Sequence, residues 1–439
     1  MSITGRTVAV ALLGTLLAAL LGRAGILAVC VALLLGVAVD LALAGRIRQL
    51  ALSRSGATQT RLGQPATVTL LVTNTGRRRV RGRLRDGWVP SAGASPPLTR
   101  IDVPAGERRR YDTVLVPTRR GDRSTAHVTI GSTGPLGLAA RQRRHTRRID
   151  GRRVQTAPWT VRVLPPFASR RFLPEKLARL RQLDGMVAVH RRGQGTEFDS
   201  LREYVDGDDV RSIDWRATAR RDAVVVRTWR PERDRRLVCV LDTGRTAAAR
   251  VGDSPRLDAA LDACLLLAAV AARAGDRVDL LAADRQVRAS VEGARHAEVL
   301  PQLVAAMATL EPALVETDAS LLVTEVLRRA RKRCLVVLFT ALEGAAAEEG
   351  LLPVLPALTA RHTVVLASVG DPRVAELSAG RADAAAVYDA AAAERALGER
   401  RRLTAVLRRR GVEVVDAPPE TFASVVADAY LALKAEGRL

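Results

Sequence analysis

The sequence is poor in the residues that build several common kinds of functional site. Aromatic residues make up 3% of its 439 residues, and lysine occurs only three times. Proteins that bind single-stranded nucleic acid stack the bases on aromatic side chains, so this class is disfavoured. The five histidines show no HxH or HExxH spacing, which argues against a zinc enzyme. The four cysteines lie in apolar runs, as reduced core residues do, and do not suggest a disulfide framework.

Acidic residues are also scarce relative to basic ones, and the net charge is +23. Residues 46–165 carry 25 arginines and only six acidic residues, so most of the surplus lies in this one region. Two interpretations remain open for it. The arginines either form an ordinary solvated face or lie near anionic membrane lipids, where each cation contributes about 1 kcal/mol. Nucleic acid is not expected as a partner.

A long apolar segment lies near the N-terminus. Residues 7–44 are apolar apart from Arg23 and Asp40, and this stretch is too long for one membrane span of about 20 residues. Glycines around Arg23 interrupt it, which predicts a transmembrane helical hairpin in residues 1–45, with spans over roughly 6–22 and 25–44. A cleavable signal peptide is the alternative, and the second apolar run argues against it.

Flanking charges predict the orientation of this hairpin. Arg6 precedes it, Arg46, Arg48 and Arg54 follow it, and only Arg23 lies at the turn. The positive-inside rule therefore predicts a two-pass protein of the inner or plasma membrane, with the bulk of the chain in the cytoplasm.

Residues 56–165 have the pattern of a small β-sandwich. Short β-branched or alternating runs are separated by Gly, Pro and Asp, at the spacing typical of such domains. The runs are Thr67–Thr73, Val80–Leu84, Arg110–Val116, Ala126–Ile130 and Thr160–Leu164.

Residues 166–236 are expected to form a linker helix and then a dense polar motif. Acidic side chains and arginines alternate there around one tryptophan, which predicts a salt-bridge lattice in a turn. Asp206 and Asp208 could instead bind a cation, although the EF-hand spacing is absent. The motif residues, as candidates for partner binding or structure, are Arg202, Glu203, Tyr204, Asp206, Gly207, Asp208, Asp209, Arg211, Asp214 and Trp215.

Residues 237–439 alternate strands and helices in the manner of a doubly wound α/β sheet of the Rossmann type. The first strand, Leu237–Leu241, ends at Asp242, where such folds bind ligands. The further elements expected are strands at Arg277–Ala282, Cys334–Phe339, His362–Val369 and Val412–Val415, and helices at 255–274, 295–310, 318–332, 392–410 and 419–435.

The block from Gly195 to Asp234, followed by LVCVLDTGRT, resembles the family catalogued as domain of unknown function fifty-eight. The resemblance covers essentially the whole chain, and its most specific part is the REY…GDD…R.IDW motif. It implies a membrane hairpin, a β-rich segment and a C-terminal domain similar to von Willebrand factor type A. It also implies a partnership with a MoxR-type AAA+ ATPase.

The resemblance to type A domains implies a Mg²⁺ site at a DxSxS loop, a threonine from a second loop and an acid from a third. Here Asp242, Thr246 and Thr317 are the matching candidates. Gly244 and Ala341 stand where oxygen ligands are expected, so the site is degenerate, although Asp318 or Glu343 could compensate. We therefore expect no cofactor, or at most Mg²⁺, and favour a structural role in which Asp242 caps loop amides.

These features predict a membrane-anchored, non-enzymatic scaffold or adaptor. Its A-like domain would bind a MoxR-type AAA+ ATPase or the client of that ATPase, supporting assembly or chaperone-like maturation, and membrane lipids would be a second partner. Two alternatives come from other classes. One is an extracellular adhesion or matrix-binding protein, and the other is a hydrolase that uses the acids of the GDD and IDW segments.

Overall fold

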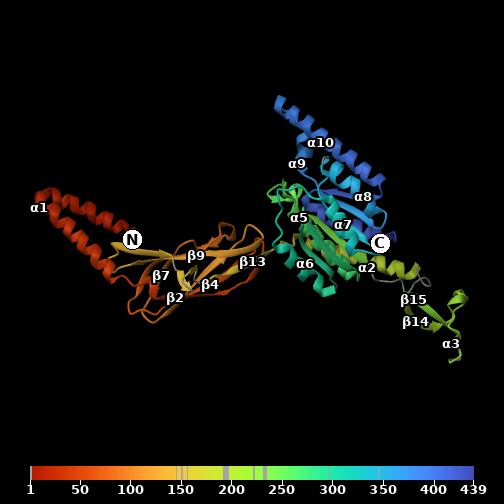
Figure 1. Cartoon of the computed structure of the whole chain (residues 1–439), viewed down its shortest axis with the longest axis horizontal. Helices are drawn as coiled ribbons and strands as arrows, with labels where there is room; N and C mark the ends of the chain where they lie inside the picture. Colours follow the sequence, from red (N-terminus) through yellow and green to blue (C-terminus); the bar gives the residue numbers. More distant parts are fainter. Residues whose placement is uncertain are drawn as a thin grey trace. The chain divides into compact units, whose positions relative to one another are not determined.

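The computed structural model describes residues 2–144, 146–149, 152–155, 157–190, 197–220, 223–230, 235–294, 296–344 and 346–439. The chain forms two compact units, residues 1–166 and 167–439, and its fold is mixed α/β (Figure 1). The first unit holds an apolar helix and two β-sheets. The second unit holds a parallel sheet flanked by helices and the segment with the polar motif.

The apolar N-terminal segment forms α1, Gly5–Leu43, whose helical dihedral angles break at Gly22 (φ 62°, ψ −151°). Figure 1 draws α1 as two arms that meet at this bend. The prediction of two spans requires a correction. Among the described residues only Gly25–Gln49 is long and apolar enough to cross a membrane, by length and composition. The part of α1 before Gly22 is shorter than the roughly 20 residues that one span needs.

The second part of α1 is fixed to the β-sheet of its own unit through one buried carboxylate. Asp40 is fully buried and accepts hydrogen bonds from the backbone N–H groups of four consecutive residues, 136–139, at 2.7–3.3 Å. These residues form the turn between β9, Gly121–Thr133, and β10, Ala139–Arg144. An acid in an apolar helix thus serves as the acceptor for a loop that would otherwise leave its amides unpaired.

Two sheets, antiparallel except for the parallel pair β13 and β3, account for most of the rest of the first unit. One has seven strands and contains the path β1-β10-β9-β13-β3, in which β9 also pairs with β5 and β5 pairs with β7. The other has the order β2-β4-β8-β6, and β2 is Leu50–Gly56. Alternating apolar residues from both sheets meet in a common core that includes Leu70, Val80 and Ile130. The four-stranded sheet starts before residue 56, the expected start of the β domain, because Leu50–Gly56 already pairs with β4. The remaining strands are β1 (Ser2–Ile3), β3 (Gln59–Arg61), β4 (Ala66–Asn74), β5 (Val80–Trp88), β6 (Ala94–Ser95), β7 (Thr99–Val103), β8 (Arg108–Leu115) and β13 (Thr160–Leu164), beside a separate β11–β12 hairpin (Thr146–Ile149, Arg152–Gln155).

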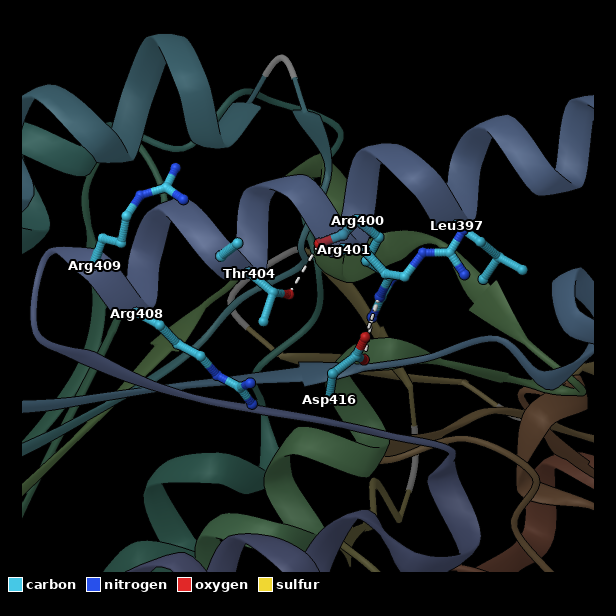
Figure 2. Close-up of a pocket in the computed structure, with 8 residues that line it drawn as sticks. Leu397, Arg400, Arg401, Thr404, Arg408, Arg409 and Asp416 are labelled. Atoms are coloured by element: carbon cyan, nitrogen blue, oxygen red, sulfur yellow. Dashed lines mark hydrogen bonds and ion pairs between the residues drawn. The ribbon is translucent and has the colours of Figure 1, made fainter.

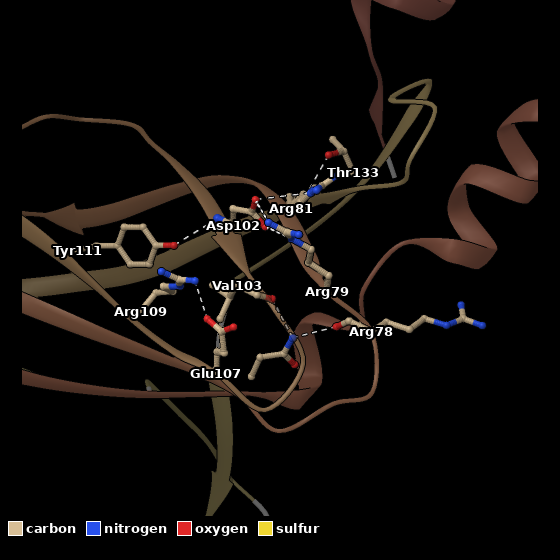
Figure 3. Close-up of polar contacts among 10 residues, drawn as sticks. Arg78, Arg79, Arg81, Asp102, Val103, Glu107, Arg109, Tyr111 and Thr133 are labelled. Atoms are coloured by element: carbon tan, nitrogen blue, oxygen red, sulfur yellow. Dashed lines mark hydrogen bonds and ion pairs between the residues drawn. The ribbon is translucent and has the colours of Figure 1, made fainter.

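Many arginines of this unit are paired with the few acids around them (Figure 3). Arg79 binds both carboxylate oxygens of Asp102, Arg81 lies 3.6 Å from the same group, and Arg109 lies 2.6 Å from Glu107. The hydrogen bond from Arg79 lowers the pKa of Asp102. Because these side chains are about half exposed, such pairs contribute little to stability. They order part of the basic surface without neutralising it.

The second unit is built on a six-stranded sheet with the order β20-β19-β16-β21-β22-β23. All neighbouring strands are parallel except the edge pair β19 and β20. The four central strands are buried on both faces and are rich in Val and Leu, as parallel strands between helices are. The strands are β16 (Arg236–Asp242), β19 (Arg277–Ala283), β20 (Val287–Ala294), β21 (Leu335–Phe339), β22 (Thr363–Val369) and β23 (Val412–Ala417).

Helices cover both faces of this sheet. On one face, apolar residues of α7, α8 and α10 join the core of the sheet, for example Val326, Leu355 and Leu403. On the other face α5 packs against α6 and α11. The helices are α2 (Leu173–His190), α4 (Arg245–Ala248), α5 (Arg256–Arg273), α6 (Val299–Ala308), α7 (Ala319–Arg329), α8 (Leu352–Thr359), α9 (Pro372–Ser378), α10 (Ala384–Arg409) and α11 (Pro419–Ala435).

Several elements of the second unit differ from the sequence-based expectation, and α8 and α9 were not expected at all. The helix expected at 392–410 begins earlier, because Asp383 caps it by accepting a hydrogen bond from the backbone of Ala386 and an alanine-rich segment follows. Strand β20 was not expected. It lies at an edge of the sheet, and its sequence VRASVEGA lacks an apolar run.

Candidate functional site

The polar motif folds around a β-hairpin in the second unit. Strand β14, Glu197–Glu203, pairs with β15, Val225–Arg230, and the residues between them form a 3-10 turn and the short helix α3, Trp215–Thr218. The N–H of Tyr204 donates to the carbonyl of Val224 at 2.8 Å and extends the pairing. The motif is therefore the insertion that connects two paired strands.

Asp208 and Asp214 both support the backbone of this insertion. Asp208 accepts from Arg202 at 2.5 Å and from the backbone of Val205 at 3.0 Å. Asp214 caps α3 through the amides of residues 216 and 217 and pairs with Arg227 at 2.7 Å. Hydrogen bonds to the charged form lower the pKa of both carboxyls, from Arg202 first for Asp208 and from the amide of residue 217 first for Asp214.

The other motif residues take simpler positions. Asp209 caps the 3-10 turn by accepting from the amide of Arg211 at 2.9 Å, and Glu203 ends β14. Asp206 and Gly207 lie in the exposed turn before it, where Gly207 has φ 104°. Where the sequence predicts a salt-bridge lattice, the described residues form two separate ion pairs, Arg202–Asp208 and Arg227–Asp214, together with helix and turn caps.

The same segment exposes large apolar side chains. Trp215 is 68% exposed, and Val205 and Val210 are each 62% exposed. The polar contacts of the motif fix the backbone that carries these three residues. The hairpin therefore presents an apolar surface whose conformation is held by charged and capping groups.

A second site lies at the carboxyl end of the central strand β16. The side chain of Asp242 is buried and accepts four hydrogen bonds. The backbone of Gly244 donates to Oδ1 at 2.8 Å, and the hydroxyl of Thr317 donates to the same oxygen. The hydroxyls of Thr246 and Thr340 donate to Oδ2 at 3.2 and 2.7 Å. One carboxylate thus joins the ends of β16 and β21 to the loop before α7.

Charged side chains close to this carboxylate are paired with one another. Arg256 lines the small pocket beside Asp242 and forms an ion pair with Glu343. Arg245 pairs with Glu316 at 2.7 Å on the exposed side of the loops. Glu343 therefore neutralises an arginine here, and Asp318 caps α7 through the backbone of Leu321. Both acids that could have completed a metal site have other partners.

The donor set fits a divalent cation poorly. Mg²⁺ prefers several oxygen ligands, usually with more than one carboxylate or phosphate nearby. Asp242 is the one carboxylate at this point of the described structure, and the three threonine hydroxyls direct their hydrogens at it. A side chain at Gly244 has no room, because a Cβ there would collide with the Thr317 hydroxyl. No chemical step is therefore assigned to a metal at this site.

A further buried acid, Asp284, supports the neighbouring loop at the end of β19. It accepts from the hydroxyl of Thr243 at 3.1 Å and from Arg288 at 2.7 Å, as well as from two backbone amides. Burial alone would raise its pKa, but these hydrogen bonds outweigh that effect and lower it. Asp284 and Asp242 are linked through Thr243, so the two loops are held as one network.

The sequence identified three members of this network, and the structure brings them together. Asp242, Thr246 and Thr317 meet within hydrogen-bonding distance. Thr340 and Arg256 were missed. Thr340 directly follows a buried strand, which is a signal that could have identified it, whereas no local pattern marks Arg256.

Comparisons with known proteins place the family match on the second unit. The model of the family described as "Protein of unknown function DUF58" matches residues 200–415, which include the polar motif and Asp242. Uncharacterized proteins of Mycobacterium tuberculosis and Mycobacterium bovis are 28% identical over 188 residues, 42% of this chain. The chain spans 58% of the length of these curated relatives.

Solved structures show only remote likeness. The CARDB domain of a Pyrococcus furiosus protein, solved with di-metal ions, is 14% identical with a TM-score of 0.18, and covers 26% of this chain and 86% of its own. A GH20 exo β-N-acetylglucosaminidase from Vibrio harveyi is 11% identical with a TM-score of 0.17, and covers 70% of this chain and 59% of its own. Scores this low carry no argument about fold or function.

Proposed function

We propose that this protein is a membrane-anchored, non-enzymatic scaffold or adaptor. Its C-terminal sheet would be a von Willebrand factor A-like domain that binds a MoxR-type AAA+ ATPase or the client of that ATPase. The strand order, the buried carboxylate after the central strand and the match to the DUF58 family support this proposal.

The observation that carries the proposal is the closed hydrogen-bond network around Asp242. A carboxylate with four donors already in place is a poor general base, because removing a proton from a substrate would require it to lose these bonds. The same network holds three loops at the carboxyl ends of the strands in a fixed conformation. This end of the sheet, here called the Asp242 edge, therefore suits the docking of a partner that recognises shape.

Docking at this edge is proposed to be independent of metal. In a type A domain with a complete metal site, an acid from the partner completes the coordination of the ion. Here the place of the ion's ligands is taken by Gly244 and Ala341, and the threonine hydroxyls are bonded to Asp242. Chelation should then leave the complex intact.

The polar motif is proposed to contribute the apolar part of the docking surface. Trp215 is 68% exposed, and large apolar side chains exposed on an ordered backbone often mark protein interaction sites. Tryptophan is also among the residues that contribute most to binding energy at interfaces.

The membrane anchor is proposed to be the span Gly25–Gln49, with the bulk of the chain in the cytoplasm. The span Gly25–Gln49 supports membrane anchoring, and the arginines at both flanks of α1 support the orientation. Periplasmic activity of a C-terminal reporter would contradict this topology and favour an extracellular adhesion protein instead.

An affinity pull-down of the full-length protein from solubilised membranes tests the proposal. We expect an AAA+ ATPase to co-purify equally with and without EDTA, and Trp215→Ala to reduce its recovery several-fold. The matched control is Tyr388→Ala, since Tyr388 is another exposed aromatic residue (78%) outside the motif. Loss of the complex on chelation would contradict metal-independent docking, and equal loss with both variants would contradict the role of the motif.

A further inference from the structure

A basic groove runs along helix α10, away from both sites described above. It has a volume of about 580 Å³, and eight residues line it (Figure 2). Most come from α10, and one comes from β23, the edge strand of the six-stranded sheet. The lining residues are Leu397, Arg400, Arg401, Thr404, Ala405, Arg408, Arg409 and Asp416.

The spacing of these residues shows that the groove follows one face of the helix. Positions 397, 400, 401, 404, 405, 408 and 409 recur at intervals of three and four, which places them on a single stripe. Arg401 and Arg408 are seven positions apart, so these two cationic positions lie about 10 Å apart along the helix at about 1.5 Å per residue. The stripe is too long for one small anion to contact both ends.

One arginine of the stripe is fixed by the protein itself. Arg400 binds both carboxylate oxygens of Asp416 and donates to the hydroxyl of Ser368 at 2.8 Å. Figure 2 shows Arg400 directed at Asp416 from the helix. This contact neutralises the one acidic residue of the groove and forms one of its walls.

The other arginines keep their positive charge available. In the part of the chain that the structure describes, the guanidinium groups of Arg408 and Arg409 form no hydrogen bond or ion pair, and Arg401 has only Glu394 at 3.9 Å. Figure 2 shows Arg408 extending on the same side of α10 as Asp416. After Arg400 and Asp416 cancel, Arg401, Arg408 and Arg409 leave the lining of the groove positively charged, and among the described residues only Arg401 of these three has an acid within 4 Å.

These features select an extended anionic ligand without flat rings. Guanidinium groups match carboxylates in geometry and can bind them through two hydrogen bonds. The groove has no aromatic lining residue on which a nucleotide base could stack. An extended peptide rises about 3.3 Å per residue, so carboxylates three residues apart would match cations about 10 Å apart.

We propose that the groove on α10 binds an acidic, extended segment of a partner protein, with Arg401 and Arg408 contacting its carboxylates. This inference does not depend on the function of the Asp242 edge or of the motif. It gives the second unit an additional contact surface, formed by α10 and β23. The arginines of this surface would favour acidic partners.

The test measures binding of a labelled hexapeptide to the full-length protein in neutral detergent by fluorescence anisotropy. The peptide has two pairs of glutamate separated by two serines and amidated ends. We expect saturable binding that weakens with salt, and a loss of about tenfold in affinity for Arg408→Glu. The control is Arg402→Glu, which makes the same charge change on an exposed position of α10 outside the groove.

Each other outcome would overturn the proposal. Equal weakening by Arg408→Glu and Arg402→Glu would show general attraction to a protein of net charge +23. Displacement of the peptide by equimolar inorganic phosphate or ATP would indicate a site for small phosphorylated ligands. Displacement by vesicles of anionic lipid, with no effect of neutral vesicles, would indicate a lipid surface. A failed ATPase pull-down would leave this result unchanged, so the two proposals fail separately.

Discussion

Asp40 and Asp242 are both buried carboxylates with four hydrogen-bond donors, yet the donors differ in kind. Asp40, in the first unit, is bound by backbone amides of four consecutive residues. Asp242, in the second unit, is bound by one amide and three threonine hydroxyls. Amides are fixed by the course of the chain, whereas hydroxyls can rotate toward another acceptor. The first carboxylate therefore holds one loop through donors that cannot turn away, and the second joins several loops through hydroxyl donors that can rotate.

This difference predicts the largest effect for Asp40→Ala. Four backbone N–H groups would lose their acceptor without being able to turn elsewhere, so we expect the first unit to lose at least about 3 kcal/mol of stability. Hydrogen exchange at residues 136–139 and the denaturant midpoint in detergent would measure it. Asp122→Ala is the control, because Asp122 is an exposed acid of the same unit. Similar losses in both variants would remove the special role of Asp40.

For Asp242→Ala we expect a smaller loss, about 2 kcal/mol, in the second unit. The threonine hydroxyls would lose their shared acceptor but could bond to nearby carbonyl groups or water. Asp242→Asn should lie between wild type and alanine, because its amide oxygen still accepts. Urea unfolding followed by circular dichroism would measure this loss of stability. The control is Asp389→Ala, because Asp389 is an exposed acid of the same unit. A loss larger than that of Asp40→Ala would contradict the distinction between fixed and rotatable donors.

The sequence predicted some features of the two units and missed others, for physical reasons. Strand β13 matches its expected bounds, Thr160–Leu164, because its alternation of side chains is local. Asp242, Thr246 and Thr317 could be named because the resemblance to type A domains implies oxygen ligands at these positions, and only Asp242 was also marked by its place after a buried strand. Arg256 and the capping role of Asp40 could not, since each depends on a partner far away in sequence. The two expected spans failed on length, because Gly22 breaks the helix early.

The tight fit at Gly244 distinguishes a closed site from a metal site. Gly244→Ser would direct its Cβ at the Thr317 hydroxyl, and we expect a loss of about 1–2 kcal/mol from overpacking. Thr317→Ala in the same chain should recover part of this loss, giving a favourable coupling in a double-mutant cycle. Unfolding with and without Mg²⁺ would measure both terms. Stabilisation of the single variant by Mg²⁺ would show that only the missing serine prevents metal binding.

The ion-pair partners in the polar motif are partly exposed, so we expect a substitution there to change the structure only locally. Asp208 pairs with Arg202, which is partly exposed, and the pair holds a surface turn. We expect Asp208→Ala to leave the global unfolding midpoint unchanged and to speed hydrogen exchange at Val205, which Asp208 accepts from. Asp206→Ala, in the same turn, is the control. Loss of a hydrolytic activity with an intact fold would instead support the hydrolase alternative.

Asp284 is a third buried carboxylate, and it differs from Asp40 and Asp242 in having a charged partner, Arg288. Its pKa is lowered from the ordinary value of 3.8, so it stabilises the second unit above that value, and this contribution is lost as the pH falls through the lowered pKa. Arg288→Met removes the charged hydrogen bond and should raise the pKa, so that stability begins to fall at a higher pH. Denaturant midpoints between pH 3 and 7 would show it as a small shift of the acid limb, with Arg285→Met controlling for net charge. Coinciding acid limbs for Arg288→Met and wild type would mean that the two amides and Thr243 alone hold the charged form of Asp284.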